Sequence, residues 1–194
     1  MKKYLGVIKL FVTWRVILFA FSLFIVPLSR SFEIFSNFDG IRFLNIAKEG
    51  YGTPHTFYSY SLFPLFPLLI HSLSSVFGGL VSGLLVSHIF TVASLFVFKK
   101  LAELDYSKEI TKNAVVYYLI FPSSFFLVSV YSESLFLFLC LLSVLFMRQK
   151  KYLLSAIIAL FASYTRMSGI FLWVMLLIEY YNNHKDNFKN FLKP

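Results

Sequence analysis

Two acids and one arginine in an otherwise apolar chain are candidates for chemistry. Asp39 lies in the segment NFDGIRFLNIAKEGYG (37–52), Glu133 lies in VYSES (130–134), and Arg166 interrupts a long apolar run. A carboxylate can accept the proton of a hydroxyl group, and a guanidinium can hold a phosphate through paired hydrogen bonds. Because a charge at the centre of a membrane helix costs ~2.5 to 3.5 kcal/mol on insertion scales, charges retained there need an explanation.

The composition indicates a membrane protein with several crossings. Apolar residues make up 58% of the chain and charged residues 14%, and the apolar stretches are too many and too long for one soluble core of 194 residues. We therefore predict an all-α transmembrane bundle of about five or six membrane segments, forming a single membrane domain over residues 1–194. Helices are expected over the apolar runs 5–28, 79–98, 113–130, 131–147 and 152–178, with a proline-interrupted segment at 62–77.

Lysine and arginine residues predict the orientation. They concentrate at the N-terminus and in segments 99–112 and 148–151, which we expect to be cytoplasmic, whereas acids balance them in the external loop 29–61. The net charge of +9 therefore reflects the orientation of the chain in the membrane and not a nucleic-acid binding patch, so we expect no nucleic-acid partner. In this arrangement Arg166 lies about 14 residues into its helix, which raises it by roughly 21 Å and brings it within reach of Glu133 at the outer face.

Simpler roles for the polar residues are open at this stage. Asp39 fits an ordinary solvated acid of an external loop, and Glu133 with Arg166 fits an ion pair that joins two helices. Arg15 is expected to extend its guanidinium to the head groups or to the carbonyl end of a helix. Histidines such as His88 lie on apolar runs without a second ligand at metal spacing, so we expect packing histidines and no tightly bound metal.

Four motifs, in the same order along the chain, resemble the PIG-V type of GPI mannosyltransferases and their prokaryotic relatives. FDGIRFLNIAKEGY (38–51) is similar to the family pattern W-D-x-x-[YF]-x-x-I-A-x-x-G-Y, and LFPLFP (62–67) is similar to F-F-P-x-Y-P. FPSSFFLVSVYSESLF (121–136) is similar to N-P-x-S-x-x-x-x-x-x-Y-S-E-S-L-F, and SYTRMSG (163–169) to A-x-T-R-x-x-G. Phenylalanine stands at three positions where the family usually has Trp, Tyr or Asn.

The resemblance implies a GT-C fold, which is a multi-helix membrane glycosyltransferase with its active site on the non-cytoplasmic face. It implies transfer of a sugar, mannose in this family, from a polyprenyl- or dolichyl-phosphate donor to a hydroxyl acceptor. A departing phosphate needs a cation and not an acid catalyst, so the two carboxylates of a glycosidase are not required. The expected partners are membrane lipid and the lipid-linked sugar donor. No tightly bound cofactor is implied, although some GT-C enzymes use a divalent cation.

This chemistry assigns a role to each candidate residue. Asp39 is the expected catalytic base, which accepts the proton of the acceptor hydroxyl. Six further residues are expected to bind the substrate: Arg42, Lys48, Tyr131, Ser132, Glu133 and Arg166. Among them Arg166 is the first candidate for the phosphate, and the two other cations are rivals nearer to the bilayer surface. Glu133 would orient that guanidinium or a substrate hydroxyl.

Two other classes of function are left open. A transporter or lipid-flippase subunit should show internal repeats and ionisable residues near the midplane, and the sequence shows no repeat. The other class is a non-catalytic membrane fragment whose loop binds a partner. The resemblance covers only the N-terminal half of such an enzyme, so we expect the other half in a C-terminal continuation or in a second membrane subunit.

Overall fold

The protein is a bundle of helices. The computed structural model describes residues 2–27, 30 and 32–191, and these ranges contain helices and turns but no strand, which confirms the predicted all-α fold. Their α-helices are α1 (Lys2–Ile25), α2 (Asp39–Glu49), α3 (Leu65–Phe77), α4 (Gly79–Ala102), α5 (Lys108–Ile120), α6 (Glu133–Arg148), α7 (Tyr152–Ser163) and α8 (Ile170–Phe191). Short 3-10 helices join some of them: η2 (Glu33–Ser36), η3 (Pro122–Val128) and η4 (Met167–Gly169).

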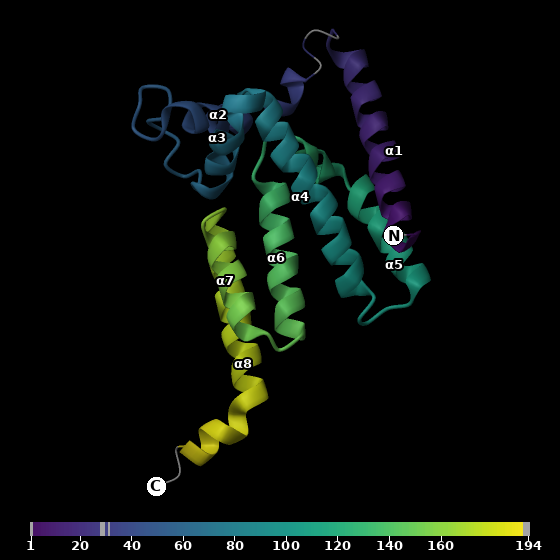
Figure 1. Cartoon of the computed structure of the whole chain (residues 1–194), viewed down its shortest axis with the longest axis vertical. Helices are drawn as coiled ribbons and strands as arrows, with labels where there is room; N and C mark the ends of the chain where they lie inside the picture. Colours follow the sequence, from purple (N-terminus) through teal and green to yellow (C-terminus); the bar gives the residue numbers. More distant parts are fainter. Residues whose placement is uncertain (1, 28–29, 31, 192–194) are drawn as a thin grey trace.

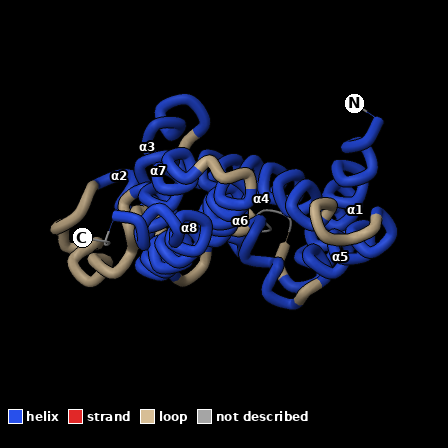
Figure 2. Tube along the Cα trace, turned by 90° about the horizontal axis from the view of Figure 1, so that it is seen from below, coloured by secondary structure: helices blue, strands red, loops and turns tan. Residues whose placement is uncertain are grey.

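The helices form an elongated layer that carries a small cap at one end. In Figure 1, α4 and α6 run side by side at the centre, with α1 and α5 on one side and α7 and α8 on the other. The view from below in Figure 2 shows the same row, with α1 and α5 at one end of it. The short helices α2 and α3 pack against each other and against α4, so they cover the upper end of the layer.

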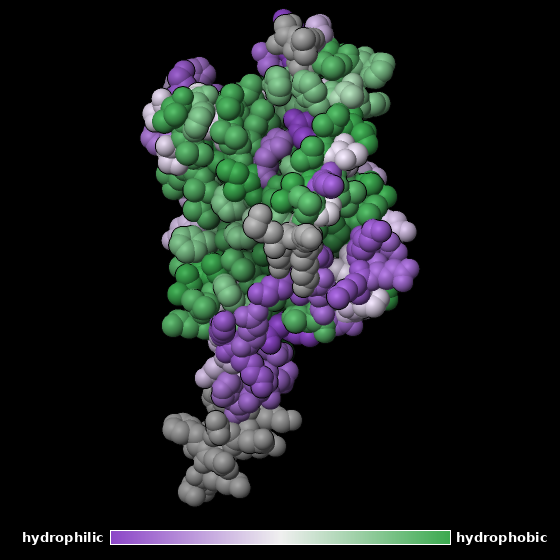
Figure 3. Space-filling view, turned by 45° about the vertical axis from the view of Figure 1, so that its right-hand side comes forward, coloured by the Kyte–Doolittle hydropathy of each residue, from purple (hydrophilic) through white to green (hydrophobic). Residues whose placement is uncertain are grey.

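Within the described ranges, two helices are long and apolar enough to cross a membrane, Leu5–Ile25 and Gly79–Ala102. The pair η3 and α6 adds a third candidate if the two, which are bent by 99°, count as one span, and α3 and α7 are shorter apolar helices. Figure 3 shows a broad hydrophobic surface with hydrophilic residues gathered mainly toward its lower end. The chain is therefore a membrane protein, while the total of about five or six segments stays a prediction.

A polar contact inside the bundle joins α1 to α4. The Nε–H of Arg15 donates to Nε2 of His88 over 2.7 Å, and Nδ1 of His88 lies 2.6 Å from the Leu84 carbonyl oxygen. The Arg15 guanidinium also lies over the Phe35 ring, 4.2 Å from its centroid. The expected extension of Arg15 to the head groups or to a helix end is therefore wrong, because an imidazole acceptor and an aromatic face are available inside the protein.

Two predicted helices are interrupted. The helix expected at 113–130 is α5, which ends at Ile120 because Pro122 lacks the N–H that a continuing helix needs. The helix expected at 152–178 is in fact two antiparallel helices, α7 and α8, joined by residues 164–169 (Figure 1). Gly169 permits the reversal, because a Cβ there would lie 2.5 Å from the backbone carbon of Ala162. Arg166 consequently lies in the turn between two helices and not inside one helix.

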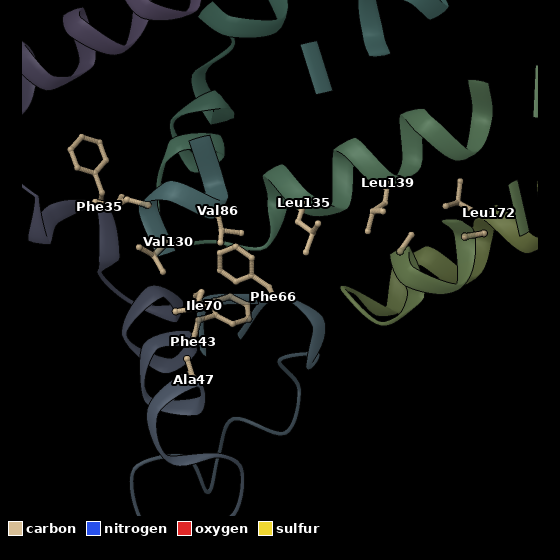
Figure 4. Packing of buried hydrophobic residues seen from close by; sticks show 13 residues of the cluster. Phe35, Phe43, Ala47, Phe66, Ile70, Val86, Val130, Leu135, Leu139 and Leu172 are labelled. Carbon is tan, nitrogen blue, oxygen red and sulfur yellow. The ribbon is translucent and has the colours of Figure 1, made fainter. Parts of the chain in front are cut away.

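The segment predicted as an external loop, 29–61, is partly helical. It contains η2 and α2, and the buried residues of α2 recur with helical spacing at Gly40, Phe43, Ile46 and Ala47. The Phe43 ring lies edge-on to that of Phe66 in α3, with centroids 5.0 Å apart, inside the buried cluster of Figure 4. The charges and the glycine of this helix suggested a loop, whereas its 3.6-residue apolar period was the available signal for a helix.

Small residues and hydroxyl groups let the helices approach closely. A Cβ on Gly83 of α4 would lie 2.7 Å from Cγ1 of Val130, so the turn before α6 packs against α4 only because this residue is glycine. Between α6 and α7, the buried hydroxyls of Ser143 and Ser155 lie 3.0 Å apart. Such contacts stabilise helix pairs in lipid, where apolar burial alone gives little preference for protein neighbours.

Candidate active site

A polar pocket lies at the capped end of the bundle, where segments distant in sequence meet. Its volume is about 250 Å³, and its walls come from the start of α2, residues 61–63, the turn before α6 and the turn between α7 and α8. The lining residues are Asp39, Phe43, Ser61, Leu62, Phe63, Tyr131, Ser132, Glu133, Thr165, Arg166, Met167 and Ser168. The fold thus brings most of the residues selected from the sequence into one pocket.

Asp39 is the first residue of α2, a position at which an acidic side chain stabilises the helix through its dipole. The preceding residue, Phe38, has a φ of +54°, which is strained for a residue other than glycine. Arg42, one turn further along α2, places Nη1 3.4 Å from Oδ1 of Asp39, and the two side chains are 52% and 46% exposed. Asp39 is therefore only loosely paired and is accessible from the pocket.

Arg166 is held in place by α6. Its Nη1 lies 2.5 Å from Oε1 of Glu133, and its guanidinium carbon lies 6.0 Å from the centroid of the Phe136 ring, one turn further along the same helix. The other carboxylate oxygen, Oε2 of Glu133, is buried and has no hydrogen-bond partner among the described residues. The predicted approach of Arg166 to Glu133 is confirmed, although the turn between α7 and α8 produces it and not the rise of a single long helix.

Tyr131 and Ser132, the two residues before Glu133, also line the pocket. The Tyr131 hydroxyl donates to the Asn37 carbonyl over 2.9 Å, and the backbone N–H of Val130 donates to the Phe35 carbonyl over 2.7 Å. These bonds fix the turn before α6 against the segment that leads into α2. Burial of the phenol raises the pKa of Tyr131, and the negative charges of Asp39 and Glu133 raise this pKa further.

The two rival cations lie outside the pocket walls. Arg42 stays close through its contact with Asp39. Lys48 follows Asp39 by about two and a half turns of α2, which corresponds to roughly 13 Å along the helix axis. Its ammonium lies 4.0 Å from Glu49, its side chain is 81% exposed, and it borders a separate cavity beside His71. The helical conformation of α2, which the sequence reasoning did not predict, separates Lys48 from the pocket.

Several pocket residues were not selected from the sequence. Ser61, Thr165 and Ser168 supply hydroxyl groups, while Phe63 and Met167 supply apolar surface. Most of them lie within or beside the motifs LFPLFP and SYTRMSG, so their position in these motifs was the available signal. Within the ranges that the structure describes, no group of three His, Cys, Asp or Glu side chains could hold a metal ion. The expectation that no metal is tightly bound stays a prediction.

The fold and the pocket together define a helical membrane protein with a carboxylate and a carboxylate-bound guanidinium at one end of its bundle. The family model described as Mannosyltransferase (PIG-V) matches residues 10–191, a range that includes every residue of the pocket. The chain therefore belongs to this mannosyltransferase family, which confirms the resemblance found in the four motifs and supports glycosyltransferase activity in general. Neither a curated protein nor a solved structure matches the chain.

Proposed function

We propose that the chain transfers a mannosyl group from a polyprenyl- or dolichyl-phosphate donor to a hydroxyl acceptor, and that the pocket is the site of this reaction. The observation that carries the proposal is the presence of Asp39 and Arg166 in the walls of one pocket in a chain of the mannosyltransferase family. This pairing supplies the two groups that the reaction needs, a proton acceptor and a cation for the departing phosphate.

The reaction exchanges one bond at the anomeric carbon for another. The oxygen of the acceptor hydroxyl forms a bond to this carbon while the bond from the carbon to the phosphate oxygen breaks. Asp39 takes the proton of the hydroxyl, and the electron pair of the broken bond remains on the phosphate, next to Arg166. A general base is typically worth ~10² to 10⁴ in rate, and a preorganised charge-stabilising donor ~10² to 10³ in kcat.

Glu133 acts in this proposal as a positioning residue. Its Oε1 holds the Arg166 guanidinium at 2.5 Å, which directs the guanidinium toward the pocket without loss of side-chain entropy on substrate binding. The buried Oε2 has no hydrogen-bond partner among the described residues, an arrangement that is costly, and a sugar hydroxyl reaches it only if the pocket opens on substrate binding. Ser132 and Tyr131 would contribute hydrogen bonds from the same wall.

Exposed apolar side chains beside the pocket suit a lipid-linked donor. Phe38, directly before Asp39, is 85% exposed, and Met167, directly after Arg166, is 74% exposed. Both can contact an isoprenoid chain while the phosphate reaches the pocket. The distribution of lysine and arginine supports a cytoplasmic N-terminus and a pocket on the non-cytoplasmic face.

A membrane assay tests the proposal. Membranes that contain the chain are incubated with polyprenyl-phosphate mannose carrying a radiolabelled sugar, and in parallel with a labelled nucleotide sugar in the presence of an inhibitor of lipid-phosphate mannose synthesis. We expect label in a new product from the lipid donor alone. Transfer from the nucleotide sugar under this block would refute the proposed donor. Movement of intact labelled lipid across the membrane without any new product would instead support a flippase.

A further inference from the structure

A second cavity lies at the opposite end of the bundle from the candidate active site, between α1, α5 and the end of α4. Its volume is about 530 Å³, so it is larger than the polar pocket. The residues that line it are Gly6, Val7, Leu10, Lys99, Glu103, Lys108, Lys112, Val115 and Val116. We call it the lysine groove. In Figure 1 the helices that supply its walls, α1, α5 and the end of α4, meet in the lower right part of the bundle.

The charged groups of the groove give it a positive balance. Lys99 and Glu103 pair with each other across 3.6 Å and are only 16% and 18% exposed. Lys108 and Lys112 add two further positive charges, one turn apart on the same face of α5. Lys108 and Lys112 repel each other at this spacing and oppose the dipole at the N-terminus of α5, and Glu109 in the same turn offsets only part of their charge. An anion in the groove would remove both penalties.

The rest of the wall is apolar and is formed by residues of α1 and α5. Val7 and Val115 are 6% and 3% exposed and form the base, while Val116 and Leu10 continue the apolar wall. Gly6 leaves room in the groove, because a Cβ built on it would meet nothing within 4 Å. A small soluble anion would pair with the lysines but would leave this apolar wall uncovered. A ligand with a phosphate and long hydrocarbon chains would cover both.

We propose that the lysine groove binds an anionic glycerophospholipid of the surrounding membrane. The phosphate lies between Lys108 and Lys112, and an acyl chain follows the wall past Gly6 and Leu10. Basic pockets between membrane helices are suited to anionic head groups, since each lysine near the bilayer surface contributes attraction and the helices supply the apolar contact. This site is independent of the proposed transfer reaction, because it shares no residue with the polar pocket.

Lipid binding to the purified full chain tests the proposal. Dissociation constants are measured in a neutral detergent for phosphatidylglycerol and for phosphatidylcholine with the same acyl chains. The test variant is Lys108→Gln with Lys112→Gln, and the matched control is Lys150→Gln with Lys151→Gln, two exposed lysines on the short connection between α6 and α7. Each lysine near the bilayer surface contributes about fivefold to the affinity for an anionic lipid. We therefore expect phosphatidylglycerol to bind roughly 25-fold more weakly to the test variant. Phosphatidylcholine binding and the control variant should be unchanged.

A steric variant tests the apolar half of the groove separately. Gly6→Leu fills the open space next to the wall and keeps all the lysines, so it should weaken phosphatidylglycerol binding severalfold while leaving the binding of glycerol phosphate unchanged. Equal losses in the test and control lysine variants would overturn the proposal, since general surface charge would then explain the binding. Glycerol phosphate that binds as tightly as the lipid would also overturn it, because the apolar wall would have no part in recognition.

Discussion

The sharpest prediction concerns the ion pair between Glu133 and Arg166, because it separates a structural role from a role in catalysis. The change is the double variant Glu133→Leu with Arg166→Met, which removes both charges and keeps similar side-chain volumes. The pair is close, at 2.5 Å, but its side chains are 32% and 40% exposed. A pair this exposed contributes about 1 kcal/mol of stability, so its removal should leave the protein folded.

The expected effect on catalysis is larger than the effect on folding. If Arg166 holds the departing phosphate, its loss should lower kcat by ~10² to 10³, or about 2.7 to 4 kcal/mol in the transition state. The double variant should then be as inactive as Arg166→Met alone, because removing Glu133 as well cannot replace the missing cation. Glu133→Gln alone should cost less, since the amide oxygen can still accept a hydrogen bond from the guanidinium. Initial rates of mannosyl transfer in membranes, normalised to the amount of protein, measure all three.

A matched control pair lies at the other end of the bundle. Arg148 binds Asp105 through two hydrogen bonds of 2.9 and 2.6 Å, and both side chains are 43% exposed. The double variant Arg148→Met with Asp105→Leu should therefore alter stability to a similar extent and leave the transfer rate near that of the wild type. Recovery of activity in the Glu133 and Arg166 double variant, above the level of Arg166→Met, would refute the assignment of Arg166 to the phosphate and leave it the role of joining two helices.

Four further predictions address the remaining parts of the structure. Asp39→Asn should accumulate normally in the membrane, still bind the lipid donor and lose at least ~10²-fold in turnover, because only the base is removed. Gly169→Ala should destabilise the chain by ~1 to 3 kcal/mol and reduce transfer, since its Cβ would lie 2.5 Å from the backbone of α7 and would displace the turn. The orientation is tested with single cysteines in a chain whose Cys140 is replaced by serine. The positions are Tyr58 and Tyr106, which are 85% and 60% exposed. A cysteine at position 58 should react with a membrane-impermeant thiol reagent outside intact cells, and a cysteine at position 106 should not, because we expect it to be cytoplasmic. Finally, the Arg148 guanidinium lowers the pKa of Asp105. The wild type should therefore be more stable than Asp105→Asn above about pH 4, and this difference should disappear as the pH falls through the lowered pKa. Thermal unfolding at several pH values measures the difference.

Each of these predictions has an outcome that contradicts it. Full activity of Asp39→Asn together with misfolding of Asp39→Ala would make the carboxylate a helix-stabilising group. A wild-type transfer rate for Gly169→Ala would mean that the position of the turn does not matter for Arg166. Labelling of a cysteine at position 106 from outside the cell would refute the proposed orientation. A stability difference for Asp105→Asn that does not shrink at all as the pH is lowered below about 4 would exclude the carboxylate charge as its cause.

The sequence by itself determined the class of the protein and the charged residues of its pocket, Asp39, Glu133 and Arg166, together with Tyr131 and Ser132. Apolar composition and the lysine-rich connections are properties of the chain alone, because each apolar run must be buried or face lipid wherever it lies. Glu133 and Arg166 were paired correctly from their expected depth, since two charges placed in an apolar region at one level must find each other or another partner. The four motifs identified the family without any knowledge of the fold.

Tertiary structure decided which of the charged residues share a site. The reversal at Gly169 depends on the close approach of two backbones, which no apolar pattern encodes, and it places Arg166 in a turn. The helix α2 exists because its apolar face packs against α3, and its geometry keeps Asp39 in the pocket while it moves Lys48 away. Arg15 contacts His88 and Phe35 because the fold brings α4 and η2 next to α1. The apolar period of α2 was a sequence signal for that helix, but the energy that places these side chains comes from contacts between segments far apart in the sequence, which only the assembled bundle reveals.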